Sequence, residues 1–182
     1  MYIQFCTPAH ICSHYIGPTL LVKDNFVSMF LDDLLSSLRI NGDRNAFCIK
    51  DEFYKYSELE KGIKSIISQL EDIPDDIPKG RIGIVCSDDF ETYASLLAVW
   101  FSGSAYVPLG LQNPVERNLS ILTAAGVSVI ISKIQLDPQS YSNFTIIQPN
   151  TSREIDAELD PTAIAKDDLL YILFTSGSTG NP

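Results

Sequence analysis

The sequence has few histidines, few basic residues and no long apolar run. Only two of its 182 residues are histidines, and both lie within the first 14 positions, so no histidine base is available elsewhere in the chain. Lysine and arginine number 13 against 23 aspartates and glutamates, which gives a net charge of −10. Such an acidic chain lacks the basic surface by which proteins bind nucleic acid or anionic lipid. We therefore expect no nucleic-acid partner and no membrane partner.

The sequence also lacks a targeting signal and a membrane span. Its first ten residues, MYIQFCTPAH, contain neither the basic region nor the apolar region of a secretory signal. The longest uncharged apolar run covers residues 93–101, whereas a helix needs roughly 20 apolar residues to cross a bilayer. We expect a cytoplasmic protein.

The four cysteines show neither a CxxC motif nor the dense spacing of a disulfide framework. This pattern is typical of reduced thiols in a cytoplasmic protein. Cys48 and Cys86 lie in apolar, strand-like runs, so we expect both in the core.

A cluster near the N-terminus combines both histidines with two cysteines: Cys6, His10, Cys12 and His14. In an extended segment the last three would share one face, which a zinc ion could use. The spacing matches no standard zinc finger, however, and we expect no metal site.

Hydrophobic periodicity predicts that strands alternate with helices along the chain. The helices are expected between residue 24 or 25 and residues 41–42, between residues 57 and 70, between residues 87–89 and 103, and between residues 113 and 126. The strands are expected at residues 46–49, 53–56, 81–86, 105–110, 127–132, 144–148 and 169–174, the first two forming a hairpin. This alternation indicates an α/β fold with a mostly parallel sheet covered by helices on both faces. In such sheets, ligands bind beyond the carboxyl ends of the strands.

Two helix starts carry capping signals. Ser57 and Glu60 have the S-x-x-E spacing of a capping box. In the second start, Asn113 is the expected cap, Pro114 the first helical residue, and Glu116 follows three positions after the cap.

Three further features have simple structural interpretations. Trp100 lies on the broad apolar face of its predicted helix, so we expect it in the core. The acidic stretch 149–168 is expected to cross the surface in contact with solvent. Its Arg153 and Lys166 are weak candidates for phosphate contacts.

The final stretch, residues 169–182, reads LLYILFTSGSTGNP. Its six uncharged apolar residues predict a buried strand that ends in a loop of hydroxyls and glycines. Backbone N–H groups and hydroxyls of such a loop can bind an anion, because glycine allows the positive φ angles that turn them toward one point. The candidate phosphate-binding residues are Thr175, Ser176, Gly177, Ser178, Thr179 and Gly180.

The terminal string resembles the phosphate-binding signature of the adenylate-forming superfamily, most closely that of amino-acid adenylation domains of peptide synthetases and D-alanine carrier-protein ligases. Two other stretches resemble motifs of the same family in the same order: YKYSEL at residues 54–59, and the segment 96–132 with its AYVPL strand and Pro-x-Glu-Arg helix. The joint occurrence of three motifs is far more specific than any one of them.

The resemblance implies that a carboxylate, either a small acid or an amino acid, reacts with ATP to give an acyl-adenylate and pyrophosphate. The acyl group then passes to the thiol of a phosphopantetheine carrier protein or of CoA. It implies that the candidate loop holds the β- and γ-phosphates together with Mg²⁺, as positioning residues. The resemblance places no catalytic residue within these 182 residues.

The resemblance covers the N-terminal part of a large AMP-binding domain, with residues 1–23 as an irregular lead-in. In the family, a Lys and a Gly follow the Asn-Pro, and the remaining domain and a small mobile domain lie downstream. We therefore expect the 182-residue chain alone to be inactive. Two alternatives stay open: a non-catalytic remnant or split-protein half that acts through a partner, and an unrelated nucleotide-binding α/β module.

Overall fold

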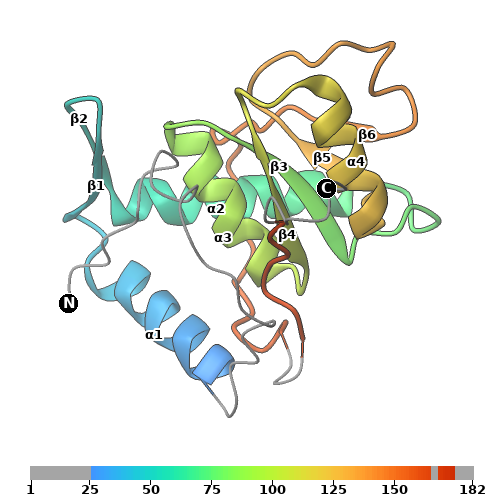
Figure 1. Cartoon of the computed structure of the whole chain (residues 1–182). Coiled ribbons are helices and arrows are strands. Elements are labelled where there is room, and N and C mark those ends of the chain that lie inside the picture. The colour runs from blue at the N-terminus through green and yellow to red at the C-terminus, as the bar shows by residue number, and fades with distance from the viewer. Residues whose placement is uncertain (1–25, 165–167, 175–182) are drawn as a thin grey trace.

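The computed structural model describes residues 26–164 and 168–174. Within this part of the chain, helices and strands alternate (Figure 1). Their bounds are α1 (Phe26–Ile40), β1 (Asn45–Ile49), β2 (Glu52–Lys55), α2 (Tyr56–Glu71), β3 (Arg81–Cys86), α3 (Phe90–Phe101), β4 (Ala105–Gly110), α4 (Val115–Ala125), β5 (Val129–Ile131) and β6 (Thr145–Ile147). The predicted helices are confirmed, as are the predicted strands up to residue 148, although β5 and β6 are shorter than expected.

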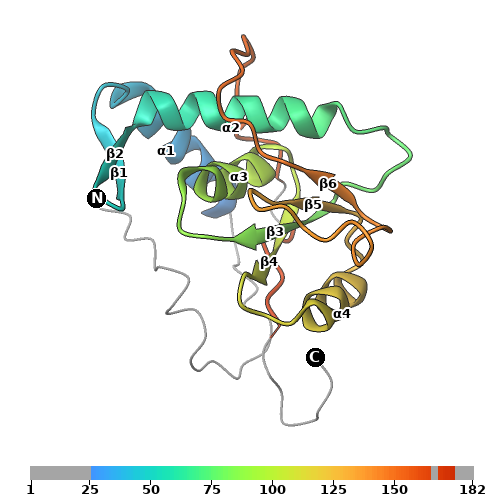
Figure 2. The ribbon, with the colours of Figure 1, turned by 90° about the horizontal axis from the view of Figure 1, so that it is seen from above.

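Four strands form one sheet in the order β4-β3-β5-β6, and each neighbouring pair is parallel. Helices cover both faces, as Figure 2 shows: α1, α2 and α3 lie on one side of the sheet and α4 on the other. The predicted α/β architecture is therefore confirmed. Because the four strands are parallel, their carboxyl ends all lie at the same end of the sheet.

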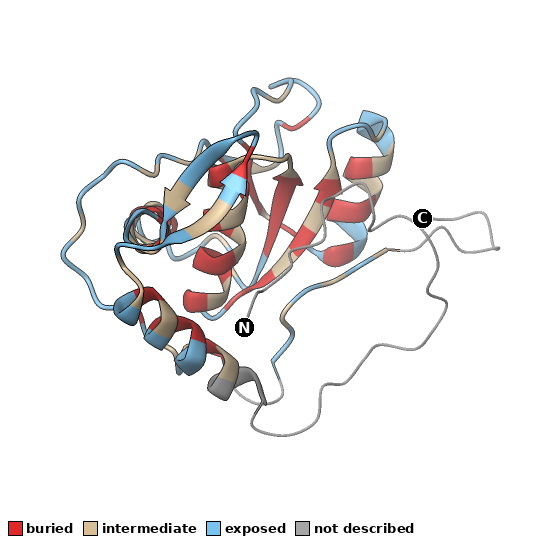
Figure 3. Ribbon diagram, turned by 90° about the vertical axis from the view of Figure 1, so that its left-hand side faces the viewer, coloured by how far each residue is buried: buried red, intermediate tan, exposed pale blue. Residues whose placement is uncertain are grey.

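Alternation along β3 supplies both faces of the core. Ile82 and Ile84 are fully or almost fully buried in the cluster that includes α2 and α3, whereas Val85 is buried in the cluster that includes α4. Burial of each such aliphatic side chain contributes roughly 1.5–3 kcal/mol. Figure 3 shows the buried residues concentrated where the helices meet the sheet.

The hairpin of β1 and β2 stands apart from this sheet. Its two turn residues, Lys50 and Asp51, have φ angles of 51° and 67°, which match the right-handed twist of paired strands. The hairpin keeps much of its surface in solvent, and Cys48 is exposed. The prediction that Cys48 lies in the core is therefore wrong. Strand β1 belongs to a separate hairpin, and the face that carries Cys48 is exposed. Cys86 is half-buried, and burial raises the pKa of its thiol to about 11.

The start of α2 differs from the prediction. The helix begins at Tyr56, and the Glu58 carboxylate accepts a hydrogen bond from the backbone N–H of Lys55 at 2.6 Å. Glu58 therefore has the role that we predicted for Glu60. Ser57 is already helical, so it cannot cap the helix, and its N–H donates to the Gly42 carbonyl in the turn that follows α1.

The start of α4 also lies one residue later than predicted. The helix begins at Val115, and Pro114 occupies the cap position without a side-chain hydrogen bond. The amide of Asn113 instead donates to the Asn118 side chain at 3.0 Å. Gly126 ends the helix with a φ of 65°, as predicted for a left-handed terminal glycine.

The acidic stretch after β6 crosses α2 and returns toward the sheet. The charged side chains that the structure describes in this stretch are exposed, as predicted, and three of them form ion pairs with α1, α2 or the residue that caps α2: Arg39–Glu158, Lys61–Glu154 and Arg153–Asp72. Exposed pairs of this kind contribute little to stability. Leu159 and Ile164, however, are buried in the core, so the stretch is anchored at two points. Arg153 is committed to Asp72, and Lys166 lies outside the described residues.

Gly103 ties this stretch to the end of α3. It has a φ of 72°, and a Cβ atom there would lie 2.6 Å from the backbone oxygen of Ala163. Gly126 has nearly the same φ, 65°, but a Cβ atom there would have no contact closer than 3.6 Å. The two glycines therefore separate backbone strain from steric overlap.

We expect Gly126→Ala to lower the free energy of unfolding by about 1–2 kcal/mol, the cost of a left-handed conformation for a residue with a Cβ atom. Gly103→Ala should cost about 1–3 kcal/mol more, because the new methyl group also displaces a backbone carbonyl. Urea unfolding monitored by circular dichroism measures both values. Equal losses in the two variants would show that Ala163 is not packed against Gly103.

Candidate functional site

Residues 169–174 lie beside β4 at the outer edge of the sheet. A single parallel bridge joins Tyr171 to Tyr106. The backbone N–H of Tyr106 donates to the carbonyl oxygen of Leu170 at 3.1 Å, and the N–H of Ile172 donates to that of Tyr106 at 3.0 Å. The segment therefore runs in the direction of β4.

The prediction of a buried strand is only partly right. Leu169, Tyr171 and Leu173 are 44%, 43% and 50% exposed, whereas the alternate side chains Ile172 and Phe174 pack against the cluster of α4. The uncharged run suggested burial on both sides, but no helix among the described residues covers the side chains of Leu169, Tyr171 and Leu173. Figure 3 shows this alternation along the segment.

Aromatic side chains hold the segment against the sheet. The indole N–H of Trp100 donates to the Leu170 carbonyl at 3.0 Å, and its ring packs against the core, as predicted. Tyr106 lies between two rings, with centroids 5.7 Å from Trp100 and 5.8 Å from Tyr171. Burial raises the pKa of Tyr106 to about 12, so this phenol is neutral at physiological pH.

This arrangement fixes where the candidate phosphate loop begins. The segment runs parallel to β4, so Phe174 lies toward the end of the sheet at which the parallel strands have their carboxyl ends. The six candidate residues, Thr175 to Gly180, follow directly but lie outside the described residues. The cluster of Cys6, His10, Cys12 and His14 lies outside them as well.

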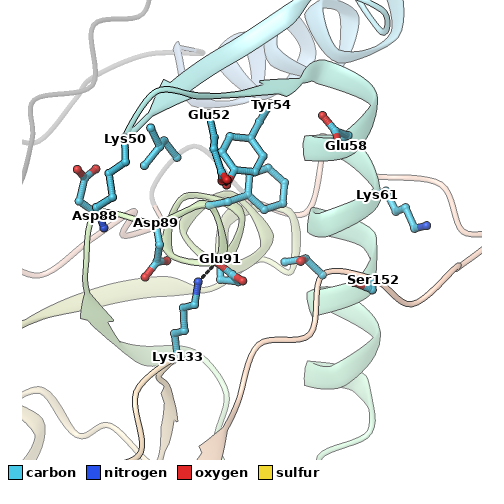
Figure 4. Close-up of a pocket in the computed structure, with 13 residues that line it drawn as sticks. Lys50, Glu52, Tyr54, Glu58, Lys61, Asp88, Asp89, Glu91, Lys133 and Ser152 are labelled. Atoms are coloured by element: carbon cyan, nitrogen blue, oxygen red, sulfur yellow. Dashed lines mark hydrogen bonds and ion pairs between the residues drawn. The ribbon is translucent and has the colours of Figure 1, made fainter.

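A separate pocket of about 460 Å³ lies beyond the carboxyl ends of β3 and β5 (Figure 4). Five carboxylates and three lysines line it, together with Tyr54, Phe90 and residues 151–152. The charged residues are Glu52, Glu58, Asp88, Asp89, Glu91, Lys50, Lys61 and Lys133. One sequence feature pointed to this region, the expected helix cap at residues 87–89. It could not show that the distant hairpin would enclose the region.

Most charges of this pocket have a partner within the protein. Lys133 lies 2.7 Å from Glu91, and this hydrogen bond raises the pKa of the lysine. Asp89 accepts the Thr92 N–H at 2.8 Å, which confirms it as the cap of α3. The Tyr54 hydroxyl donates to Glu52 at 2.7 Å.

Two further observations limit what this pocket can bind. Carboxylates outnumber lysines around it, so its field disfavours a phosphate. In addition, no group of three or more histidine, cysteine, aspartate or glutamate side chains within the described ranges is arranged to hold a metal ion. The pocket adjoins β3 and β5, whereas the segment that leads to the candidate loop adjoins β4.

No helix between residues 26 and 174, in the part that the structure describes, is long and apolar enough to cross a membrane.

Comparison with known proteins identifies the domain. A family model described as AMP-binding enzyme matches residues 36–182. Bacitracin synthase 1 of Bacillus licheniformis is 32% identical over 141 residues, which are 77% of this chain and 2% of that protein.

Solved structures agree with this match. The Klebsiella oxytoca NpsA N-terminal subdomain aligns with a TM-score of 0.64 and 25% identity, over 86% of this chain and 40% of that one. Holo-PA1221, a peptide synthetase protein containing adenylation and PCP domains, aligns with a TM-score of 0.66 and 21% identity, over 84% of this chain and 26% of that one. The chain thus spans well under half the length of these relatives. The family match covers most of the chain and includes the candidate loop: the chain belongs to the AMP-binding enzyme family, and its fold is that of the N-terminal part of an adenylation domain.

Proposed function

We propose that this chain is the N-terminal part of an ATP-dependent enzyme that activates a carboxylate. The enzyme joins a small acid or an amino acid to AMP, releases pyrophosphate, and transfers the acyl group to the thiol of a carrier protein or of CoA. The observation that carries this proposal is the family match through residue 182, which includes the hydroxyl-rich loop. The parallel attachment of residues 169–174 to β4 supports it, because the loop then follows a segment that runs toward the carboxyl ends of the strands, where ligands bind in such sheets.

The loop would act by positioning phosphate rather than by moving protons. A carboxylate oxygen of the substrate attacks the α-phosphorus, a new P–O bond forms, and the bond to the β-phosphate oxygen breaks to release pyrophosphate. The hydroxyls of Thr175, Ser176, Ser178 and Thr179, with the amides around Gly177 and Gly180, would hold the departing phosphates in line. Donors fixed in advance stabilise the charge that develops on the leaving group.

Mg²⁺ enters this proposal only with the nucleotide. Bound to ATP, it would neutralise phosphate charge. The described residues contain no cluster that fits a metal ion, so we assign it no ligand there.

The two alternatives now differ in standing. Membership of the AMP-binding family excludes an unrelated nucleotide-binding module. A role through association with a second polypeptide remains compatible with the family, and the exposed side chains of residues 169, 171 and 173 favour an interaction at that edge.

The first test replaces two hydroxyls of the loop. In a protein that carries this chain within a complete AMP-binding domain, we expect Thr175→Ala with Ser176→Ala to reduce carboxylate-dependent ATP–pyrophosphate exchange by roughly 10²-fold, because phosphate donors are lost. The free energy of unfolding should change by less than about 1 kcal/mol.

A matched control is Thr123→Ala with Ser142→Ala, since both of these side chains are exposed and lie outside the loop. This variant should retain full exchange. Unchanged exchange in a well-folded loop variant would refute the role of the loop.

The 182-residue chain by itself is expected to give no ATP–pyrophosphate exchange and weak ATP binding at most. The adenine site, the carboxylate pocket and the catalytic lysine that the resemblance implies all belong to later parts of the domain. Isothermal titration with ATP and an exchange assay on the purified chain check this expectation. Exchange above the background of a chain-free sample would contradict it.

A further inference from the structure

The carbonyl oxygen of Leu170 accepts hydrogen bonds from two different elements. The backbone N–H of Tyr106 in β4 donates to it at 3.1 Å, and the indole N–H of Trp100 in α3 donates to it at 3.0 Å. A carbonyl oxygen has two lone pairs, so both of its acceptor positions are used. Leu170 is therefore fixed both to the sheet and to a helix that covers the sheet.

The segment changes its packing partner just after Leu170. The Leu170 side chain packs against the core cluster that includes α3, whereas Ile172 and Phe174 pack against the cluster of α4. Trp100 thus holds the segment at the last residue that contacts the α3 side. This contact joins two described parts of the chain, so it does not depend on what covers the outer side of residues 169–174.

The indole of Trp100 is itself fixed before it donates. Its ring meets Phe30 edge to face, with centroids 5.6 Å apart and planes at 84°, and lies 5.7 Å from the Tyr106 ring. The backbone of the same residue is held at the end of α3, where its carbonyl accepts the Gly103 N–H at 2.9 Å. A rigid, packed ring of this kind presents its N–H from one direction.

The position of Leu170 bears directly on the candidate phosphate loop. Thr175, the first residue of the loop, follows Leu170 by only five residues. A displacement of the Leu170 peptide is therefore carried toward the hydroxyls that follow. Donors that hold phosphates in line for a displacement reaction lose much of their effect when they are misplaced.

We propose that Trp100 is a positioning residue for the candidate phosphate loop, because its indole N–H fixes the Leu170 carbonyl and thereby the segment from which the loop begins. This inference rests on the proposed function. In this role Trp100 acts through residues 169–174 and not on the substrate.

A positioning role has a kinetic signature that differs from the loss of phosphate donors. Without the indole bond, the segment is looser and must be ordered when ATP binds, so the affinity for ATP falls. Once ATP is bound, the hydroxyls and amides of the loop hold the phosphates as before, so kcat changes little. Thr175→Ala with Ser176→Ala removes the donors themselves, so it lowers the rate of ATP–pyrophosphate exchange even at saturating ATP.

Trp100→Phe tests the proposal in a protein that carries this chain within a complete AMP-binding domain. The phenyl ring keeps aromatic packing but has no N–H. In ATP–pyrophosphate exchange we expect the KM for ATP to rise roughly 5- to 10-fold, the effect of one lost hydrogen bond. The KM for the carboxylate should stay unchanged, and kcat should stay within about twofold of the unchanged protein.

A second variant separates the lost donor from the lost ring volume. Replacing Trp100 by 3-benzothienylalanine, introduced by nonsense suppression, keeps the bicyclic shape and puts sulfur in place of the N–H. It therefore preserves the packing even if the phenyl variant fails to fold. We expect the same rise in the KM for ATP. A benzothienyl variant that behaves like the unchanged protein overturns the proposal, because packing alone would then explain the role of Trp100.

Amide hydrogen exchange of the same proteins, followed by mass spectrometry, measures the position of the segment without any enzyme activity. The Ile172 N–H donates to the Tyr106 carbonyl at 3.0 Å, so its amide should exchange roughly fivefold faster in both Trp100 variants. The matched control is Tyr93→Phe, which also removes a donor from a half-buried ring of α3; that hydroxyl donates to Asp88 at 3.1 Å. The control should change neither the hydrogen exchange of residues 169–174 nor the KM for ATP.

The remaining outcomes divide in the same way. Unchanged hydrogen exchange of residues 169–174 in both Trp100 variants overturns the proposal, since the bond would then only satisfy the indole N–H. An unchanged KM for ATP overturns it as well, and so does a loss of kcat as large as that of the loop variant. An unchanged KM for ATP together with a loss of exchange activity in the loop variant refutes this inference alone. Full activity in the loop variant refutes the phosphate role of the loop itself.

Discussion

Burial of β3 on both faces is the constraint on which the rest of the architecture depends. Ile82 and Ile84 require a helical layer on one side, and Val85 requires one on the other. At Gly83, a Cβ atom would lie 2.8 Å from the Leu122 side chain, so a larger residue there would require Leu122 of α4 to shift. The two helices that flank β4 in sequence must therefore lie on opposite faces. Because the strands are parallel, their carboxyl ends lie at one end of the sheet. Ligands of open α/β sheets bind at that end.

Electrostatics distinguish the pocket from the candidate loop as sites for a phosphate. The pocket beside β3 and β5 is lined by more carboxylates than lysines, and its Lys133 is already paired with Glu91. A phosphate that entered there would have to displace that carboxylate. The loop that follows Phe174 carries no charge, so it offers backbone and hydroxyl dipoles without a competing anion. Proximity to a pocket is thus a weaker argument for nucleotide binding than the chemistry of the loop.

Local pattern predicted the elements well, because each segment has one clear period. Helix α2 buries Leu59, Ile63 and Ile66 at helical spacing, and β3 was predicted with its observed bounds. The errors arise where a neighbour distant in sequence decides the outcome. Residues 169–174 are as apolar as a central strand, but only their position beside β4 determines that one side faces solvent.

The capping errors have a different origin. A glutamate three residues after the cap occurs in two registers here: Glu60 after Ser57, and Glu58 after Lys55. The strand that precedes the helix selects Glu58 by ending at Lys55. The pocket could not be predicted either, since it depends on how the hairpin lies over the start of α3. The candidate loop was predicted from residue chemistry and motif order, and neither depends on how the chain packs.

A triphosphate site in so acidic a chain must rely on dipoles and on positive charge from elsewhere. Seven basic side chains of the described residues are paired with carboxylates, among them Lys133 with Glu91, Lys61 with Glu154, and Arg153 with Asp72. Releasing any of them toward ATP would leave an unpaired carboxylate, so the gain in one place is offset in another. The relatives are much longer than this chain, and a longer polypeptide can supply the missing cations. The acidic charge balance therefore makes weak ATP binding by the 182-residue chain the physical expectation.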